Sequence, residues 1–354
     1  MNRIQRILHH PFFIKLFNWE YWSFGAVYAL LYPVWFFLCM RARSFFFFSA
    51  SNPSIQNGGF LNESKKDIYA IMPPHLSPKT VFFSLPANAD IVIEQLRMEG
   101  LSFPLIGKPD IGGRGRGVKA LKNKTDVRDY VKHASLDFHI QEFVAYKNEV
   151  GIFYYRFPEE ENGTITGIVK KEFLCATGNG KNTIKELLKY DKRAILQMES
   201  LERIYGKELH TILKEGEKKT LVPYGNHARG AKFLDASDWI DDELTETIDG
   251  VCKQVKDFYF GRLDIRYNTL DELKQGRNFS VIEVNGAGSE PTHIYDPRHS
   301  IFFAWKEIIR HWVILLRISQ ANHKRGYKYL GFKEGVTMFR EDKTNSKKLA
   351  AMPE

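Results

Sequence analysis

Three oxygen-bearing side chains lie at the ends of two apolar runs in the second half of the chain. Asp264 lies within residues 262–266, and Glu283 and Asn285 lie within residues 281–286. Carboxylate and amide oxygens, together with substrate phosphate, suit an octahedral magnesium ion. If the two runs form neighbouring strands, these three side chains can hold magnesium against a nucleotide.

Two arginines flank the aspartate of this trio. Arg262 and Arg266 are spaced as on one face of a strand and are available to a phosphoryl group or to a developing negative charge. An aspartate beside an arginine is, however, commonly a solvated ion pair at a strand end. The acidic and basic residues of this segment therefore need support from elsewhere in the chain.

A second segment, residues 103–118, becomes rich in glycine after a short apolar run. Four of the six residues that follow Ile111 are glycine, and Lys108 precedes them. Backbone amides of glycine can close over phosphates, and the lysine supplies a point charge to the same oxygens. The run is neither a Walker A loop nor a dinucleotide fingerprint. It indicates a phosphate-binding loop, with a flexible hairpin as the alternative.

A third segment, residues 138–149, combines an apolar run with carboxylates. Glu142 is near the end of the run, and Glu149 follows seven residues later. A base is bound by main-chain and side-chain groups at a strand or linker edge, and a nearby carboxylate can accept both ribose hydroxyls. This segment is therefore a candidate adenosine site.

In this order, the three segments resemble the ATP-grasp superfamily, with the D-alanine–D-alanine ligase-like and cyanophycin-synthetase-like members closest in pattern. The resemblance covers about residues 65–297. It implies an α+β fold in which two α+β lobes hold ATP between them, with ATP and Mg²⁺ as cofactors and Mn²⁺ as an alternative metal. The implied metal ligands are Asp264, Glu283 and Asn285. The implied nucleotide contacts are Lys65, Lys108, Gly113, Arg114, Gly115, Arg116, Gly117, Gln141, Glu142, Val144 and Glu149.

The resemblance also implies individual roles. Lys108 corresponds to the lysine that contacts the α-phosphate and base, and residues 112–117 correspond to the mobile phosphate lid. Glu149 corresponds to the ribose carboxylate, and Arg262 to the arginine that steadies the transferred phosphoryl group. The adenine-reading linker corresponds to Glu142 and Val144.

Two positions fit the family pattern less well. Lys65 would be the family's additional lysine, but Lys66 is an equally charged neighbour. The lid carries Arg114 and Arg116 where the D-alanine ligases favour small hydroxyl residues. This departure puts D-alanine as the substrate in doubt.

The expected chemistry is ligation through an acylphosphate. A carboxylate attacks the γ-phosphate of ATP, and an amine then displaces phosphate to give an amide-type bond, with charge gathering beside magnesium and arginine. The substrates would be a small carboxylate and a small amine. Alternatives are a kinase-like enzyme that stops at phosphoryl transfer and a non-catalytic, membrane-attached nucleotide-binding protein. Three widely spaced cysteines lack metal-ligand spacing and fit a reducing compartment.

A polar loop at residues 224–231 is a further candidate. Arg229 and His227 are expected to contact substrate or phosphate as the loop closes and excludes water. An ordinary surface loop is the alternative. Arg229 is grouped with Arg262 and Arg266 as a candidate catalytic residue. His293 follows residues 281–286, which carry two of the candidate metal ligands, and is a candidate base or a structural histidine.

The chain is long enough for two or three packed lobes, at 354 residues and 41.1 kDa. Helices are predicted at residues 88–98, 184–190, 241–259 and 300–318, and strands at 149–157 and 164–176. The expected domains are a hydrophobic helical segment at 1–43, a small pre-grasp α/β region at 44–80, the catalytic domain at 81–320 and a polar, basic, partly disordered tail at 321–354.

The amino-terminal segment leaves three interpretations open. Residues 21–40 carry no charge, although Pro33 interrupts them. They predict a spanning helix, a helix on the membrane surface, or a buried helix or homodimer contact. Nucleotide use places the catalytic lobes on the cytoplasmic side in each case. The apolar run that follows, residues 44–49, predicts a central parallel strand, with a membrane-proximal aromatic cluster as the alternative.

The charge is strongly basic, with a net +9 and a pI near 9.2. The basic residues are dispersed, and no RNA-binding signature accompanies them, so nucleic acid is not an expected partner. Attraction to anionic lipid or to an acidic substrate fits better with the aromatic amino terminus.

Overall fold

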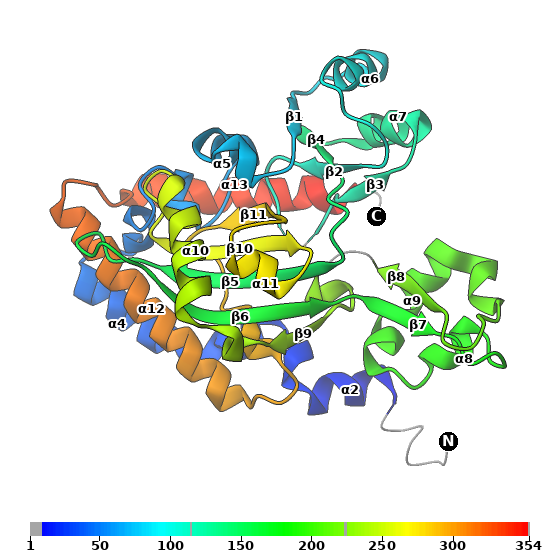
Figure 1. The fold of residues 1–354 in the computed structure, drawn as a ribbon. Helices are drawn as coiled ribbons and strands as arrows, with labels where there is room; N and C mark the ends of the chain where they lie inside the picture. Colours follow the sequence, from blue (N-terminus) through cyan, green and yellow to red (C-terminus); the bar gives the residue numbers. More distant parts are fainter. Residues whose placement is uncertain (1–8, 114, 223–224, 353–354) are drawn as a thin grey trace. The chain divides into compact units, whose positions relative to one another are not determined.

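The computed structural model describes residues 9–113, 115–222 and 225–352 (Figure 1). The chain forms two compact units, each with hydrophobic clusters of its own. The first unit contains the chain up to Pro33 together with Val169–Ala236 and Thr292–Glu307. The second unit contains Val34–Ile168, Ser237–Pro291 and the chain from Ile308 onward. Helices and antiparallel sheets in both confirm the predicted α+β class.

The second unit contains a small four-stranded antiparallel sheet with the order β1-β4-β2-β3. Two helices pack on it, and each begins at an asparagine whose side chain accepts backbone N–H groups of the first turn, namely Asn88 and Asn123. The strands are β1 (Thr80–Phe83), β2 (Leu105–Pro109), β3 (Lys119–Leu121) and β4 (Phe138–Glu142), and the helices are α6 (Ala89–Met98) and α7 (Lys124–His133).

A larger sheet in the same unit has the strand order β11-β10-β5-β6. Its strands are β5 (Asn148–Tyr155), β6 (Thr164–Glu172), β10 (Phe260–Tyr267) and β11 (Phe279–Asn285). Six consecutive residues of β5, from Glu149 to Tyr154, are buried, as expected for a central strand. The helices of this part are α4 (Tyr32–Ala42), α5 (Lys65–Ile71), α10 (Asp242–Gln254), α11 (Leu270–Lys274), α12 (Ile301–Lys324) and α13 (Phe332–Ala350), of which α4 and α12 begin in the first unit.

The first unit is built around a two-stranded sheet and one further strand. β7 (Leu174–Thr177) pairs with β8 (Lys218–Val222), and β9 (Lys232–Asp235) pairs with the last residues of β6. The helices are α2 (Pro11–Phe17), α3 (Phe24–Tyr28), α8 (Ile184–Leu188) and α9 (Lys192–Tyr205). Thr183 and Glu186 form a capping box at the start of α8, in agreement with the predicted helix start.

Short 3-10 turns complete both units. They are η1 (Trp19–Tyr21), η2 (Ala29–Leu31), η3 (Phe47–Ala50), η4 (Gln56–Gly59), η5 (Pro74–Leu76), η6 (Gly206–His210), η7 (His227–Arg229), η8 (Ser237–Trp239) and η9 (Thr292–Tyr295). The predicted strand at residues 44–49 is wrong. Residues 44–79, all of them described, contain α5 and 3-10 turns but no strand. Phe47 and Phe48 are almost fully buried, so their hydrophobicity reflects packing of a turn.

The carboxyl-terminal segment also differs from expectation. Residues 321–354 were expected to be partly disordered, but α12 continues to Lys324 and α13 spans Phe332–Ala350. Met338 and Leu349 of α13 are buried in hydrophobic clusters. Burial of a few apolar side chains therefore orders a segment whose composition is mostly polar.

Within the described residues, one helical stretch, Phe24–Ala42, is long and apolar enough to cross a membrane. Length and composition alone support that assignment, and a core helix meets the same criteria. The stretch is divided into α3, η2 and α4. Val27, Leu31 and Leu38 are each at most 4% exposed, so one side of it packs inside the protein.

Candidate nucleotide and metal site

The predicted metal ligands lie on two neighbouring antiparallel strands of the second unit. Asp264 on β10 is directly opposite Glu283 on β11, and Arg262 is opposite Asn285. Side chains of directly opposed residues start only about 5 Å apart. Two opposed carboxylates repel one another unless a cation neutralises them. The strand register therefore brings the three predicted ligands together.

Arg262 is fixed beside these ligands. Its Nε donates to Oδ1 of Asp264 at 3.0 Å, and its Nη1 donates to the backbone oxygen of Glu290 at 3.3 Å. Asp264 is only 4% exposed, so this ion pair is shielded from water. A guanidinium held in this way can stabilise negative charge that develops next to the metal ligands.

Asn285 has a buried Nδ2 with no hydrogen-bond partner among the described residues. A buried donor without a partner costs free energy, so it invites an acceptor such as a phosphate oxygen. The loop after it is fixed by the segment before α5. Ala287 N donates to Gly58 O at 3.0 Å, and Gly288 N donates to Gly59 O at 2.8 Å.

This close contact of two backbones requires glycine. A Cβ on Gly286 would lie 2.5 Å from the backbone oxygen of Gly58, well inside van der Waals contact. Asn52 holds the same region, since its side chain donates to Gly58 O and Phe260 O and accepts from the backbone of Tyr259 and Phe260. Residues 51–62 therefore support the ends of β10 and β11, the strands that carry the predicted metal ligands.

The donor set fits magnesium shared with a nucleotide. The described residues contain no group of three or more His, Cys, Asp or Glu side chains able to hold a metal alone. Magnesium, however, is commonly held by one or two carboxylates plus substrate phosphates. Asp264, Glu283 and Asn285 supply two carboxylates and an amide, which matches that requirement.

Lys108, on β2 of the small sheet, contacts β11 of the large sheet. Its Nζ donates to Gln141 Oε1 at 2.9 Å, to the Tyr69 hydroxyl at 2.5 Å and to the backbone oxygen of Ile282 at 3.4 Å. Burial lowers the pKa of Lys108 to about 8, although the charge of Glu283 opposes the shift. A cation thus lies between the sheets, next to a predicted metal ligand.

Two side chains hold this lysine in place. Gln141 donates to the Tyr69 hydroxyl at 3.0 Å and to Thr80 Oγ1 at 2.6 Å, which leaves its Oε1 directed at Lys108. Gln141 is 4% exposed and so orients the lysine. Burial raises the pKa of Tyr69 to about 12, so the phenol stays neutral. Tyr69 was not predicted, because a tyrosine in a short amphipathic helix carries no distinguishing signal.

Lys65 contacts the start of the glycine-rich loop. Lys65 Nζ donates to the backbone oxygens of Gly112 at 2.9 Å and Asp110 at 3.3 Å. Lys66 instead lies over the Phe82 ring, 4.4 Å from its centroid. The structure thus places Lys65, rather than its equally charged neighbour, on the predicted phosphate loop.

Residues of the loop adopt backbone conformations that favour glycine. Gly115 and Gly117 have φ values of 68° and 69°, and Tyr130 donates to the backbone oxygen of Gly117 at 3.0 Å. Gly113 and Arg116 are exposed. Arg114 lies outside the described residues.

A buried hydrogen bond between a histidine and an aspartate precedes the loop. His139 Nε2 lies 2.8 Å from Oδ1 of Asp110. Burial alone would raise the pKa of Asp110, but hydrogen bonds from His139, Lys66 N and Ser64 lower it below its usual value. Asp110 directly follows β2, and His139 lies on the neighbouring strand β4, so the pairing depends on strand register and was not predicted. Their hydrogen bond holds the chain immediately before the loop.

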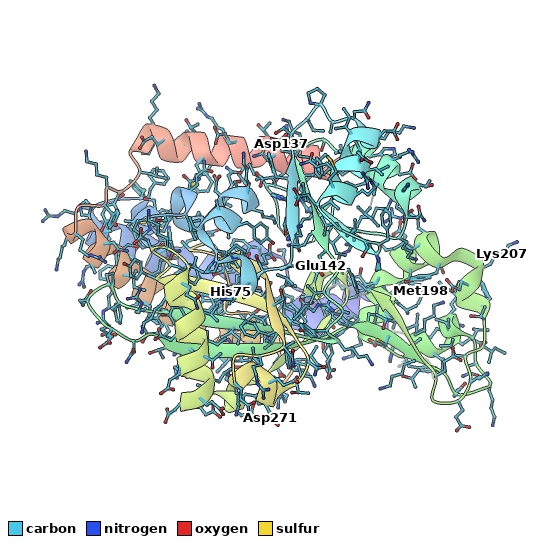
Figure 2. The ribbon with its side chains drawn as sticks, turned by 45° about the horizontal axis from the view of Figure 1, so that its top comes forward. His75, Asp137, Glu142, Met198, Lys207 and Asp271 are labelled. Atoms are coloured by element: carbon cyan, nitrogen blue, oxygen red, sulfur yellow. The ribbon has the colours of Figure 1, made fainter. Side chains whose placement is uncertain are left out.

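The predicted adenosine segment is held by an arginine. Arg266 Nε lies 2.9 Å from Oε2 of Glu149, and its Nη1 donates to the Tyr146 backbone oxygen at 3.1 Å. Arg266 thus fixes the predicted ribose carboxylate and the linker. Glu142, labelled in Figure 2 where β4 ends, is exposed, and Val144 is half-buried.

Arg229 belongs to the first unit and ends η7. His227 of the same turn lies 3.4 Å from Glu20, which also forms a buried ion pair with Arg193 at 2.8 Å. Tyr224 of this predicted loop lies outside the described residues. His293, also in the first unit, is 3.6 Å from Glu307 and is 3% exposed, as a structural histidine would be.

No protein-family model and no curated protein matches the chain. The structure is similar to a bifunctional glutathione synthetase from Pasteurella multocida, with 14% identity over 68% of this chain and 34% of that one, and a TM-score of 0.37. It is similar to D-alanine–D-alanine ligase from Bacillus anthracis, with 14% identity over 74% and 69% of the two chains and a TM-score of 0.42. It is also similar to VanG D-Ala:D-Ser ligase from Enterococcus faecalis, with 15% identity over 72% and 61% and a TM-score of 0.41.

The chain spans about a third of the glutathione synthetase and three fifths of the VanG ligase. All three TM-scores are below 0.5 and all three identities are 15% or less. A likeness at this level assigns neither a family nor an activity to this chain.

Proposed function

We propose that this protein is an ATP- and magnesium-dependent ligase of the ATP-grasp type that joins a small carboxylate to an amine. The observation that carries the proposal is the position of Lys108. It extends from β2, the strand that leads into the glycine-rich loop, to the backbone of Ile282 on β11, next in the chain to the predicted ligand Glu283. A triphosphate there would meet a buried cation, two carboxylates suited to magnesium and a buried amide donor.

Each group has a separate task in the proposed reaction. Asp264, Glu283 and Asn285 hold magnesium, which when bound neutralises phosphate charge. Lys108 binds the α-phosphate, and the loop covers the remaining phosphates. Arg262 stabilises the phosphoryl group as a substrate carboxylate attacks it, giving an acylphosphate and ADP. An amine then attacks the acyl carbon and releases phosphate.

The test separates the ligase from its alternatives. Purified protein is incubated with ATP, Mg²⁺ and pools of amino acids and small carboxylic acids, and products are identified by mass spectrometry. We expect ADP and phosphate to appear in equal amounts with an amide product. A stable phosphorylated product would instead indicate a kinase, and nucleotide binding without turnover would indicate a non-catalytic binding protein.

We also propose that α4 attaches the second unit to an anionic lipid surface. Phe36, Phe37 and Met40 on this helix are 53%, 51% and 69% exposed, while Trp35 packs on Trp312 of α12. No acidic residue occurs from residue 21 to residue 62, but the exposed Arg41 and Arg43 follow the apolar face. Aromatic side chains beside arginines suit the interface of an anionic bilayer.

Vesicle sedimentation tests this attachment. We expect the protein to sediment with vesicles of phosphatidylcholine and phosphatidylserine. The variant Phe36→Ser/Phe37→Ser should bind about tenfold more weakly, because two phenylalanines that enter the bilayer contribute more than about 1.4 kcal/mol. Ile91→Ser/Met98→Ser removes two apolar residues of α6 that are more exposed, at 67% and 69%, and this variant should bind as the wild type does. Equal binding by all three proteins, or a dimer that the α4 variant dissociates, would contradict a lipid partner.

A further inference from the structure

The segment that joins α12 to α13 carries positive charge and no negative charge. Residues 308–333 contain six lysines and arginines and no aspartate or glutamate. The connector itself, residues 325–331, follows the end of α12 in the second unit and leads into α13 (Figure 1). Lys324, Arg325 and Lys328 are exposed. A surface with this charge attracts anions.

Large apolar side chains lie beside these charges. Phe332 and Phe45 are 70% and 57% exposed. Both flank Phe46, whose ring centroid is 6.2 Å from that of Phe332. Leu330 N donates to Ser49 Oγ at 3.0 Å, which fixes the connector on the segment after α4. Exposed phenylalanines next to lysines and arginines suit the boundary between water and an anionic bilayer.

This surface is continuous with the end of α4. Gln320 Nε2 of α12 donates to the backbone oxygen of Arg41 at 3.1 Å, so the last turns of the two helices lie side by side. Arg41 directly follows Met40, an exposed apolar residue of α4. A bilayer that receives the apolar face of α4 would therefore also meet the charges of the connector.

Two arginines at this surface contact one buried tyrosine. Tyr259 is 5% exposed, and its ring centroid lies 5.0 Å from the guanidinium carbon of Arg156 and 5.8 Å from that of Arg325. Arg325 Nη1 donates to the Tyr259 hydroxyl at 3.0 Å and to Asn322 Oδ1 at 3.3 Å. Arg156 Nη1 donates to the backbone oxygen of Glu160 at 3.4 Å. The tyrosine thus keeps two like charges near one another and restrains both.

The charge of this pair is not neutralised within the described part of the chain, where both side chains donate only to uncharged oxygens. The Nε of Arg156 is buried there without a hydrogen-bond partner. The hydrogen bond to Tyr259 raises the pKa of Arg325, and the charge of Asp257 adds to this effect. Asp257 itself accepts a hydrogen bond from Ser54 at 2.7 Å. Two neighbouring guanidinium groups with N–H groups left over favour a doubly charged anion.

We propose that Arg156 and Arg325 bind the phosphomonoester headgroup of an anionic lipid, with the connector seated on the bilayer beside α4. This inference rests on the proposed attachment by α4 and names the lipid. A phosphomonoester carries about −1.5 to −2 charges at pH 7. Each planar guanidinium matches two phosphate oxygens. The protein should therefore prefer phosphatidic acid to phosphatidylserine, whose phosphate is a diester.

Vesicle sedimentation at matched surface charge tests the preference. The wild type should bind vesicles that contain phosphatidic acid about tenfold more tightly than vesicles that contain phosphatidylserine, because charge-assisted hydrogen bonds add to the general attraction. Arg156→Met/Arg325→Met should lose this preference. Lys122→Met/Lys124→Met is the matched control, because it removes two exposed positive charges from the small-sheet part of the same unit, and it should keep the preference.

A second variant separates geometry from charge and from folding. Arg156→Lys/Arg325→Lys keeps both charges but not the planar groups, so it should bind phosphatidylserine as the wild type does and show a smaller preference for phosphatidic acid. Equal binding of both lipids by the wild type, or a full preference in the methionine variant, would overturn the inference. Calorimetric binding of glycerol 3-phosphate at micromolar concentration that the methionine variant lacks would assign the pair to a soluble phosphomonoester and would overturn the lipid partner.

The α4 variant distinguishes this inference from the attachment on which it rests. Phe36→Ser/Phe37→Ser should bind both kinds of vesicle more weakly and keep the ratio between them, since Arg156 and Arg325 are unchanged. Undiminished binding by this variant would refute the attachment by α4. The ratio between the two lipids would still report on the arginine pair.

Discussion

Glu283→Gln is expected to lower the rate of ADP release at least about 100-fold, since changes even to residues that support metal ligands cost 10–100-fold. The substitution keeps the size of the side chain and its position opposite Asp264 but removes one of the two charges that attract magnesium. ATP affinity should fall much more in the presence of Mg²⁺ than in its absence. Calorimetric titration with and without Mg²⁺ measures that difference.

Glu246→Gln is the control for the loss of one negative charge. Glu246 is exposed on α10 of the same unit. Its variant should have wild-type turnover and the wild-type response to magnesium. If Glu283→Gln turned over ATP at the wild-type rate, the assignment of Asp264, Glu283 and Asn285 to magnesium would fail.

The paired strands at this site could be predicted from the sequence, because strand alternation and apolar runs are local properties. Residues 262–266 and 281–286 each carry an apolar run with polar residues at regular positions, and both form strands, β10 and β11. Their side-by-side pairing required the family resemblance, since register between distant segments depends on tertiary contacts. The helix starts at Asn88 and Thr183 were equally local, because each cap side chain binds a backbone N–H two or three residues ahead.

The features that sequence reasoning missed depend on contacts between distant segments. Tyr69 became part of the site only because α5 lies against β11, where its hydroxyl donates to Ile282 O at 3.1 Å. The order of α13 depends on few buried side chains in a polar stretch, and these find their partners in two different clusters. The composition of residues 44–49 indicates a strand, yet a 3-10 turn buries Phe47 and Phe48 equally well.

Lys108→Met is expected to lower kcat/KM for ATP about 10- to 100-fold, since a hydrogen bond between charged groups contributes about 1.5–3 kcal/mol. The pH dependence provides the sharper test. Burial lowers the pKa of Lys108 to about 8, so the free enzyme loses this cation as pH rises through that value. The wild-type kcat/KM should therefore decrease above about pH 8, and the variant should lack this decrease. Lys66→Met, at an exposed lysine, should retain the wild-type profile.

The stability of the protein should respond to pH in the opposite direction. Between about pH 8 and the ordinary lysine pKa of about 10.4, the unfolded chain keeps the proton that the folded protein has lost, so the free energy of unfolding rises with pH. A shift of this size corresponds to about 3 kcal/mol across the window. Burial raises the pKa of Cys39 and Cys252, which lowers the stability over the same pH range, so the contribution of Lys108 is measured as a difference between variants. In urea unfolding at pH 7.5 and 10, the free energy of unfolding of the wild type and of Lys66→Met should rise relative to that of Lys108→Met. The same pH response in Lys108→Met and in the wild type would mean that the buried lysine between the two sheets is not the group that titrates.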